Sequence, residues 1–423
     1  MFDTRFSGKN AFRYMKELSF ERFGGTPGEW RAAEIILSFL TDLGYDAHKE
    51  EFEVTTYRII KSELYLDGLE VPCVGVGLSG NTDDAGVEGE LIYIEGEDYP
   101  FEDLKGKIIL FIGNINFETY KKLVKSGIKA VIRVEDNPRR LPARTDIIAE
   151  WRRVGEIPMV RISYLDALNI LEKGYSNARI VLKQEISKSK SYNVVAEKRG
   201  STRQNEIIVV GGHYDSERET IGACDNLGGT AMCLELARIF SSERNLRTIR
   251  FIFFGSEELG LVGSRKYIKA HEKELEKIKL MINLDVHGQT IGIPSCIVSG
   301  GKDLETYISI LAKELGCYIR VSSSIMSSDS SSFTAKGIPA VSFFRSGGSG
   351  FFIHTPEDEI RYVSPRGLES VGILIEHFLR RVLNAKVFPF KREIPEDIKK
   401  KIDKYFRERL GIELKGATAQ QKS

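Results

Sequence analysis

The sequence has no long apolar segment, few cysteines and almost no excess of charge. Its longest apolar runs, such as residues 249–254, end after a few residues, whereas a helix needs about 20 to cross a bilayer. The five cysteines are odd in number and widely spaced, which predicts a reduced, cytoplasmic protein. The first residues lack the basic, apolar and small-residue blocks of a signal peptide. A net charge of +1 at pH 7 argues against nucleic acid or an anionic membrane as a partner.

The composition is that of a globular protein with more than one core. Of the 423 residues, 42% are hydrophobic and 10% are aromatic, which suffices for dense packing. A chain of this length exceeds the usual size of a single core, so two domains are expected.

Short, continuous apolar runs separated by amphipathic helices dominate the part of the chain after residue 190. Strands that are buried on both faces and alternate with helices indicate an α/β fold, in which helices flank a mostly parallel mixed sheet. The expected helices cover residues 29–43, 227–240 and 304–315, and the expected strands cover residues 193–196, 206–210, 249–254, 280–284 and 340–344.

Residues 62–187 differ from this pattern. Short strands alternate there with helical stretches, and no titratable cluster has the spacing of metal ligands. We therefore interpret residues 62–187 as a smaller α/β domain inserted into a main domain of residues 1–61 and 188–390, with residues 184–191 as the return linker. The charged residues 391–423 are expected to form a solvated C-terminal helix and a tail.

Imidazole and carboxylate side chains follow the apolar runs of the main domain directly. Because active sites of parallel α/β sheets gather at the carboxyl ends of the strands, these side chains are expected to converge. They are His213 and Asp215 after residues 207–210, Asp225 in a turn before a helix, Glu257 and Glu258 after residues 249–254, Asp285 after 280–284, and His354 after 340–344. Singly, such residues are usually helix caps or structural groups. Their repetition at successive strand ends favours a functional site.

Imidazole with carboxylate is a ligand set that suits zinc, cobalt or manganese. Asp225, Glu258 and Asp285 supply three negative charges and Glu257 a fourth, which equals the positive charge of two divalent ions. A single metal would leave the cluster strongly anionic, so two metal ions are expected. Asp225 would bridge them, which leaves one histidine and one carboxylate for each ion.

Five motifs of the main domain stand out together. They are His213-Tyr214-Asp215, Asp225-Asn226-Leu227-Gly228-Gly229, Glu257-Glu258-Leu259-Gly260, Asn283-Leu284-Asp285 and Ile353-His354-Thr355. In these motifs the chain closely resembles metallopeptidase family 28, which includes bacterial leucyl aminopeptidases, glutamate carboxypeptidase and the glutaminyl cyclases. The resemblance spans residues 20–60 and 190–385. Residues 106–110, 126–132 and 157–163 are similar to a protease-associated domain, which usually shapes substrate access.

The resemblance implies a metal-dependent exopeptidase, first of all an aminopeptidase that removes N-terminal residues from peptides with a water bridged by two zinc ions. It implies metal ligation by His213, Asp225 (bridging), Glu258, Asp285 and His354, with Glu257 as the general base. Asp215 would accept the other N–H of the His213 imidazole and fix its tautomer, and Asp358 and Asp329 would support the ligands. Co²⁺ or Mn²⁺ could take the place of Zn²⁺.

The sequence leaves several alternatives open. A carboxypeptidase, a dipeptidase and a glutaminyl cyclase share the resemblance, whereas a non-catalytic scaffold would be expected to lack ligands that are all present here. Ser330 stands where many relatives have a histidine, and Arg345 could either bind a substrate carboxylate or lie in an exposed loop. His287 is expected to be structural rather than a sixth ligand, and His48, His271 and His377 are expected at the surface. Self-association into a homo-oligomer is neither favoured nor excluded.

Overall fold

The computed structural model describes residues 4–414, which divide into two compact units. Unit 1 contains the chain up to Val54 and Ser189–Asp403, and unit 2 contains Thr55–Lys188 and the residues from Lys404 onward. The expected limits of the inserted domain were 62 and 187, and residues 391–423 were expected to form a segment of their own. The tail over residues 415–423 lies outside the described residues.

The sheet of unit 1 has a parallel centre with antiparallel neighbours. β14 (Ala340–Ser346), β11 (Ile278–Leu284), β9 (Arg203–His213) and β10 (Arg247–Phe254) lie side by side in this order and are parallel. The antiparallel neighbours are β8 (Asn177–Lys198) beside β10 and β12 (Ile293–Ser299) beside β14, and β13 (Arg320–Ser323) is parallel to β12. The predicted mixed, mostly parallel sheet is confirmed.

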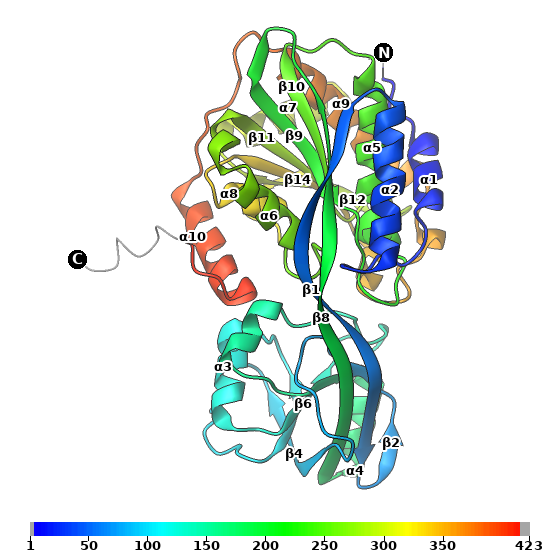
Figure 1. Cartoon of the computed structure of the whole chain (residues 1–423), viewed down its shortest axis with the longest axis vertical. Coiled ribbons are helices and arrows are strands. Elements are labelled where there is room, and N and C mark those ends of the chain that lie inside the picture. Colours follow the sequence, from blue (N-terminus) through cyan, green and yellow to red (C-terminus); the bar gives the residue numbers. More distant parts are fainter. Residues whose placement is uncertain (1–3, 415–423) are drawn as a thin grey trace, which may run out of the picture. The chain divides into compact units, whose positions relative to one another are not determined.

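Helices cover both faces of this sheet (Figure 1). One face carries α1 (Gly8–Glu17), α2 (Pro27–Asp42), α5 (Gly228–Ser241), α7 (Lys302–Glu314) and α9 (Pro365–Asn384), and the other carries α6 (Val262–Ala270), η3 (Glu272–Lys277) and α8 (Ser330–Thr334). Successive residues of a strand point to opposite faces, so Ile208 and Val210 join the first core while Ile207 and Val209 join the second. Burial on both faces explains why these strands read as continuous apolar runs.

Unit 2 is built around a second, smaller parallel sheet. β4 (Val87–Glu95), β5 (Ile108–Ile112), β6 (Ala130–Val134) and β7 (Met159–Ile162) are parallel neighbours in chain order, and β3 (Val74–Gly75) is antiparallel to β7. The unit also contains β2 (Leu69–Val71), α3 (Phe117–Ser126), η1 (Ala149–Val154) and α4 (Tyr164–Lys173). The side chains of Ile108, Ile132 and Val160 form a core with Ala167 and Ile170 of α4.

The connecting segments are more regular than expected. Residues 184–191 contain the passage from unit 2 to unit 1, between Lys188 and Ser189, but they form part of the uninterrupted 22-residue strand β8, which pairs with β1 (Asp46–Leu66). The charged C-terminal region is not simply solvated, since α10 (Glu396–Tyr405) and η6 (Phe406–Leu410) bury apolar side chains on one face. Lysine and glutamate occupy the remaining positions, so the composition of this segment does not indicate an apolar face. None of the helices described between residues 4 and 414 combines the length and apolarity needed to cross a membrane.

His271 is also more than the surface residue expected. Its Nδ1 lies 2.7 Å from Oε1 of Glu274 and its Nε2 lies 2.8 Å from Oε1 of Glu50, while its ring stacks on Tyr267 at 4.2 Å. The hydrogen bond to Glu50 is the main reason that the pKa of His271 is raised above its ordinary value, although partial burial opposes the shift. The protonated imidazole therefore links α6 to η3 and to β1.

We expect His271→Gln to destabilise the protein more at pH 5.5 than at pH 9. Because the pKa of His271 is raised by folding, its stabilisation is complete below the unfolded-state pKa of about 6.5 and is lost as pH rises through the folded-state pKa. The expected loss at pH 5.5 is about 1 kcal/mol, measured by urea unfolding. His48→Gln is the comparison: its imidazole also lies 3.4 Å from Oε1 of Glu50 but is 56% exposed, so solvent screening should make its loss smaller. An equal loss at both pH values would contradict the prediction.

Candidate metal centre

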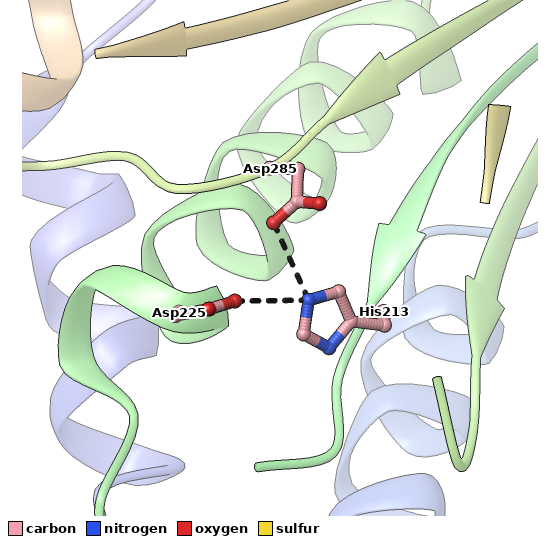
Figure 2. A group of neighbouring side chains, drawn as sticks. All are labelled: His213, Asp225 and Asp285. Carbon is pink, nitrogen blue, oxygen red and sulfur yellow. Dashed lines mark hydrogen bonds and ion pairs between the residues drawn. The ribbon is translucent and has the colours of Figure 1, made fainter. Parts of the chain in front are cut away.

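One ligand group forms where the ends of β9 and β11 meet the turn before α5. His213 is the last residue of β9, Asp285 directly follows β11, and Asp225 lies in η2 (Ala223–Leu227). Nε2 of His213 is 3.1 Å from Oδ1 of Asp225 and 3.3 Å from Oδ1 of Asp285. Figure 2 shows both carboxylates turned toward this single nitrogen. All three side chains are buried.

A second group shares Asp225. Nε2 of His354 lies 3.0 Å from Oδ2 of Asp225 and 3.4 Å from Oε2 of Glu258. Asp225 therefore presents one oxygen to each histidine, and each histidine has a further carboxylate of its own. The structure thus brings together all five residues predicted to bind metal.

The two consecutive glutamates have different surroundings. A carboxylate oxygen of Glu257 lies within 4.8 Å of ligand atoms of both His213 and Glu258. Burial raises the pKa of Glu257 well above its ordinary value, and the charges of Asp329 and Asp285 add to this, while His213 opposes it. A carboxyl group with a raised pKa is suited to accept a proton near neutral pH.

Asp215 holds the backbone of both glutamates. Its Oδ1 accepts the N–H of Glu257 at 3.0 Å and its Oδ2 accepts the N–H of Glu258 at 3.1 Å. Oδ1 of Asp215 also lies 3.4 Å from Nδ1 of His213. The side chain predicted to orient His213 therefore lies beside that imidazole, and it also positions the turn after β10.

Asp358 fixes the turn that carries Asp225. Its two carboxylate oxygens accept the N–H groups of Cys224, at 2.8 Å, and of Asp225, at 3.0 Å. Burial raises the pKa of Asp358 to about 6, although these hydrogen bonds oppose the shift. The turn also requires glycine at position 229, since a Cβ there would lie 2.3 Å from the carbonyl oxygen of Leu284. This close approach explains the glycine pair that follows Asp225 and Asn226.

The chemistry of the group fits divalent cations. Oε1 of Glu258 is buried and accepts no hydrogen bond from any residue in the described part of the chain. Burial raises the pKa of Glu258 well above its ordinary value, and the charges of Asp225 and Glu217 raise it further. Cations held between these carboxylates and the two imidazoles would offset this repulsion and use the unsatisfied oxygen.

Three residues of the site were missed by the sequence analysis. Glu217 places a carboxylate oxygen within 4.8 Å of ligand atoms of Glu258 and His354. Glu29 is fully buried and accepts a hydrogen bond from Ser256 at 2.9 Å, and burial raises its pKa to about 8. Asn226 donates to the carbonyl of Leu284 at 2.9 Å. Asn226 follows Asp225 directly in one of the five motifs and Glu29 begins the expected helix over residues 29–43, whereas no sequence feature marked Glu217.

The other candidates have structural surroundings. Asp329 is fully buried near the centre, and burial raises its pKa to about 7. His287 is fully buried and belongs to none of the ligand groups found among residues 4–414. Arg345 donates to the carbonyl of Gln289 at 2.7 Å and to Ser370 at 3.1 Å, so its guanidinium is engaged within the fold. Ser330 accepts a hydrogen bond from Ser342 in the interior.

We expect Asp358→Ala to weaken metal binding without removing a ligand. The N–H groups of Cys224 and Asp225 would lose their acceptor, and the carboxylate of Asp225 would no longer be held between the two histidines. Loss of such an outer support typically lowers metal affinity about 10–100-fold, to be measured by chelator competition. Asp303→Ala, on the distant helix α7, is the matched control. Unchanged affinity in Asp358→Ala would contradict this account.

Comparison with known proteins agrees with this geometry. The family model "Peptidase family M28" matches residues 193–379. Aminopeptidase YwaD of Bacillus subtilis is 28% identical over 94% of this chain and 88% of its own length, and an aminopeptidase of Pseudomonas aeruginosa is 28% identical over 63% of this chain but only 54% of its own. A solved zinc aminopeptidase from Bacillus subtilis has a TM-score of 0.77 at 28% identity, covering 94% of this chain and 100% of that one. An aminopeptidase from Aneurinibacillus sp. strain AM-1 has a TM-score of 0.75 at 26% identity, covering 92% and 96%. The part of the chain that carries the candidate metal centre, residues 193–379, therefore matches peptidase family M28.

Proposed function

We propose that this protein is a two-metal aminopeptidase that removes N-terminal residues from peptides. The observation that carries the proposal is the position of Asp225, which turns one carboxylate oxygen toward each of two histidines. His213 and Asp285 would hold one zinc ion with Asp225, and His354 and Glu258 would hold the other. Relatives that align along nearly the whole chain are named aminopeptidases, which favours this activity over the other exopeptidases.

The residues of the chain divide the chemistry between them. Bound metal ions would supply a Lewis acid that polarises the peptide carbonyl and makes a water molecule acidic enough to react near neutral pH. Glu257 would take the proton from the water and donate it to the departing amine, a role that its raised pKa favours. Asp215 would keep Glu257 in place through the backbone N–H and keep His213 in the tautomer that leaves Nε2 free for the metal.

The proposal also includes the nature of unit 2 and the cellular location of the protein. Unit 2 is proposed to be a protease-associated-like domain, which is supported by its small parallel sheet and by the similarity of residues 106–110, 126–132 and 157–163. A reducing, cytoplasmic location is supported by the five cysteines, all of which are free.

We expect Glu257→Gln to keep the metals and lose turnover. The amide cannot accept the water proton, so kcat should fall by about 10²–10⁴-fold while zinc content stays equal to that of the wild type. Glu258→Gln is the matched control, because it alters a proposed ligand and should lower zinc content. Mass spectrometry of the metals and steady-state kinetics give both quantities. Near-normal activity in Glu257→Gln would contradict the role of Glu257 as the general base.

A peptide panel tests the substrate class. Leucine peptides with a free amine should be hydrolysed from the N-terminus, and their N-acetylated forms should be hydrolysed at least about 100-fold more slowly, since the free amine orients the substrate. Preferential cleavage of the acetylated peptides would favour a carboxypeptidase. Ammonia release from an N-terminal glutamine peptide would favour a glutaminyl cyclase. Product analysis by mass spectrometry distinguishes the three results.

A further inference from the structure

Two arginines of unit 2 lie side by side at the carboxyl edge of its parallel sheet. Arg133 is the next-to-last residue of β6, Arg161 is the next-to-last residue of β7, and the two are directly paired in the register of these strands. Paired residues of neighbouring strands point to the same face, here the face opposite the core that contains Ile132. Ligands of open α/β sheets bind at this end of the strands.

Arg133 makes no direct polar contact through its guanidinium group among the described residues. Its guanidinium makes no hydrogen bond or ion pair with any residue between 4 and 414, although the side chain is half-buried. Burial lowers the pKa of Arg133 well below its ordinary value, the charges of Arg161 and Arg409 lower it further, and the charges of Glu135 and Asp146 oppose the shift without offsetting it. A positive group in such surroundings gains much from a nearby anion.

The carboxylates nearby do not balance these cations. Glu135 lies 3.8 Å from Arg161 and 3.6 Å from Arg140 and also accepts the N–H of Ala143, so it is shared among several donors. Asp146 is engaged by the hydroxyl of Tyr57 and the N–H of Gly77. The two carboxylates whose charges act on Arg133 therefore already serve other donors.

The C-terminal segment completes the cluster. The carbonyl of Arg409 accepts a hydrogen bond from Nε1 of Trp151 at 3.1 Å, which fixes the backbone of Arg409, while its guanidinium makes no hydrogen bond or ion pair within the described residues. The ring of Trp151 lies 6.0 Å from that of Phe117, the first residue of α3. Because α3 follows the parallel strand β5, its positive N-terminal end lies at the carboxyl edge of the same sheet.

We propose that Arg133, Arg161 and Arg409 form an oxyanion-binding site in unit 2, separate from the metal centre of unit 1. The ligand would be a carboxylate or a phosphate-like group, because the planar guanidinium fork matches both. A peptide carboxylate and a phosphate ester are two sources of this chemistry. The residues of the proposed site come from β6, β7 and the segment after α10, so the site forms only when this segment is in place.

Calorimetric titration of the full chain with sodium sulfate and with sodium acetate, at low ionic strength, tests the proposal. We expect one saturable site with a dissociation constant of about 1 mM or lower for at least one of the two anions, because two or more charge-assisted hydrogen bonds would form. Preference for sulfate indicates a phosphate-like ligand, and preference for acetate indicates a carboxylate. Absence of saturable binding to either anion up to about 50 mM would overturn the proposal.

Variants locate the binding. Arg133→Gln should raise the dissociation constant at least about tenfold while the zinc content stays unchanged, and the exposed Arg139→Gln should leave it as in the wild type. Arg409→Gln, which leaves β6 intact, should weaken binding as well and replaces Arg133→Gln if that variant does not fold. Equal affinity in the wild type and in the folded arginine variant would overturn the site, whatever the peptidase activity.

Discussion

Two backbone N–H groups converge on the carboxylate of Asp215, and the arrangement of the metal centre depends on this contact. Asp215 extends from the end of β9, and the two N–H groups belong to the turn after β10, so one fully buried side chain links two strand ends. The same carboxylate lies beside His213 and also raises the pKa of the buried Glu29. Displacement of Asp215 would therefore move a proposed ligand, the proposed base and the N-terminal segment together.

The convergence of the five proposed ligands could be predicted from the sequence because each one follows a buried strand or precedes a helix. Apolar runs that end in His213, Glu258 or Asp285 imply a parallel sheet, and the topology then brings the strand ends to one edge. Glu217 could not be predicted in this way, since it lies in a loop whose path depends on tertiary contacts. Unit 2 spans Thr55–Lys188 where residues 62–187 were expected, because no break in the polar sequence marks the points at which β1 and β8 pass from one unit to the other.

The strained backbone conformations at the candidate metal centre could not be predicted from the sequence. Ser256, Val286 and His354 adopt positive φ angles of 53°, 57° and 62°, which non-glycine residues rarely take. Val286 is the least suited to this region because it is branched at Cβ, and such a conformation costs about 1–3 kcal/mol. Each of these residues is in, or next to, the proposed ligands and base. Local preferences alone would predict different turns here, and the surrounding packing overrides them.

The contribution of the C-terminal segment to unit 2 has a consequence for biosynthesis. Residues 404–414 leave the ribosome after all of unit 1, yet Trp151 and Arg153 of unit 2 bind the carbonyls of Arg409 and Gly411. The usual order, in which an earlier domain is finished while later ones are still being translated, cannot apply to unit 2. The aromatic cluster around Trp151 therefore stays partly exposed to solvent until residues 404–414 have been synthesised.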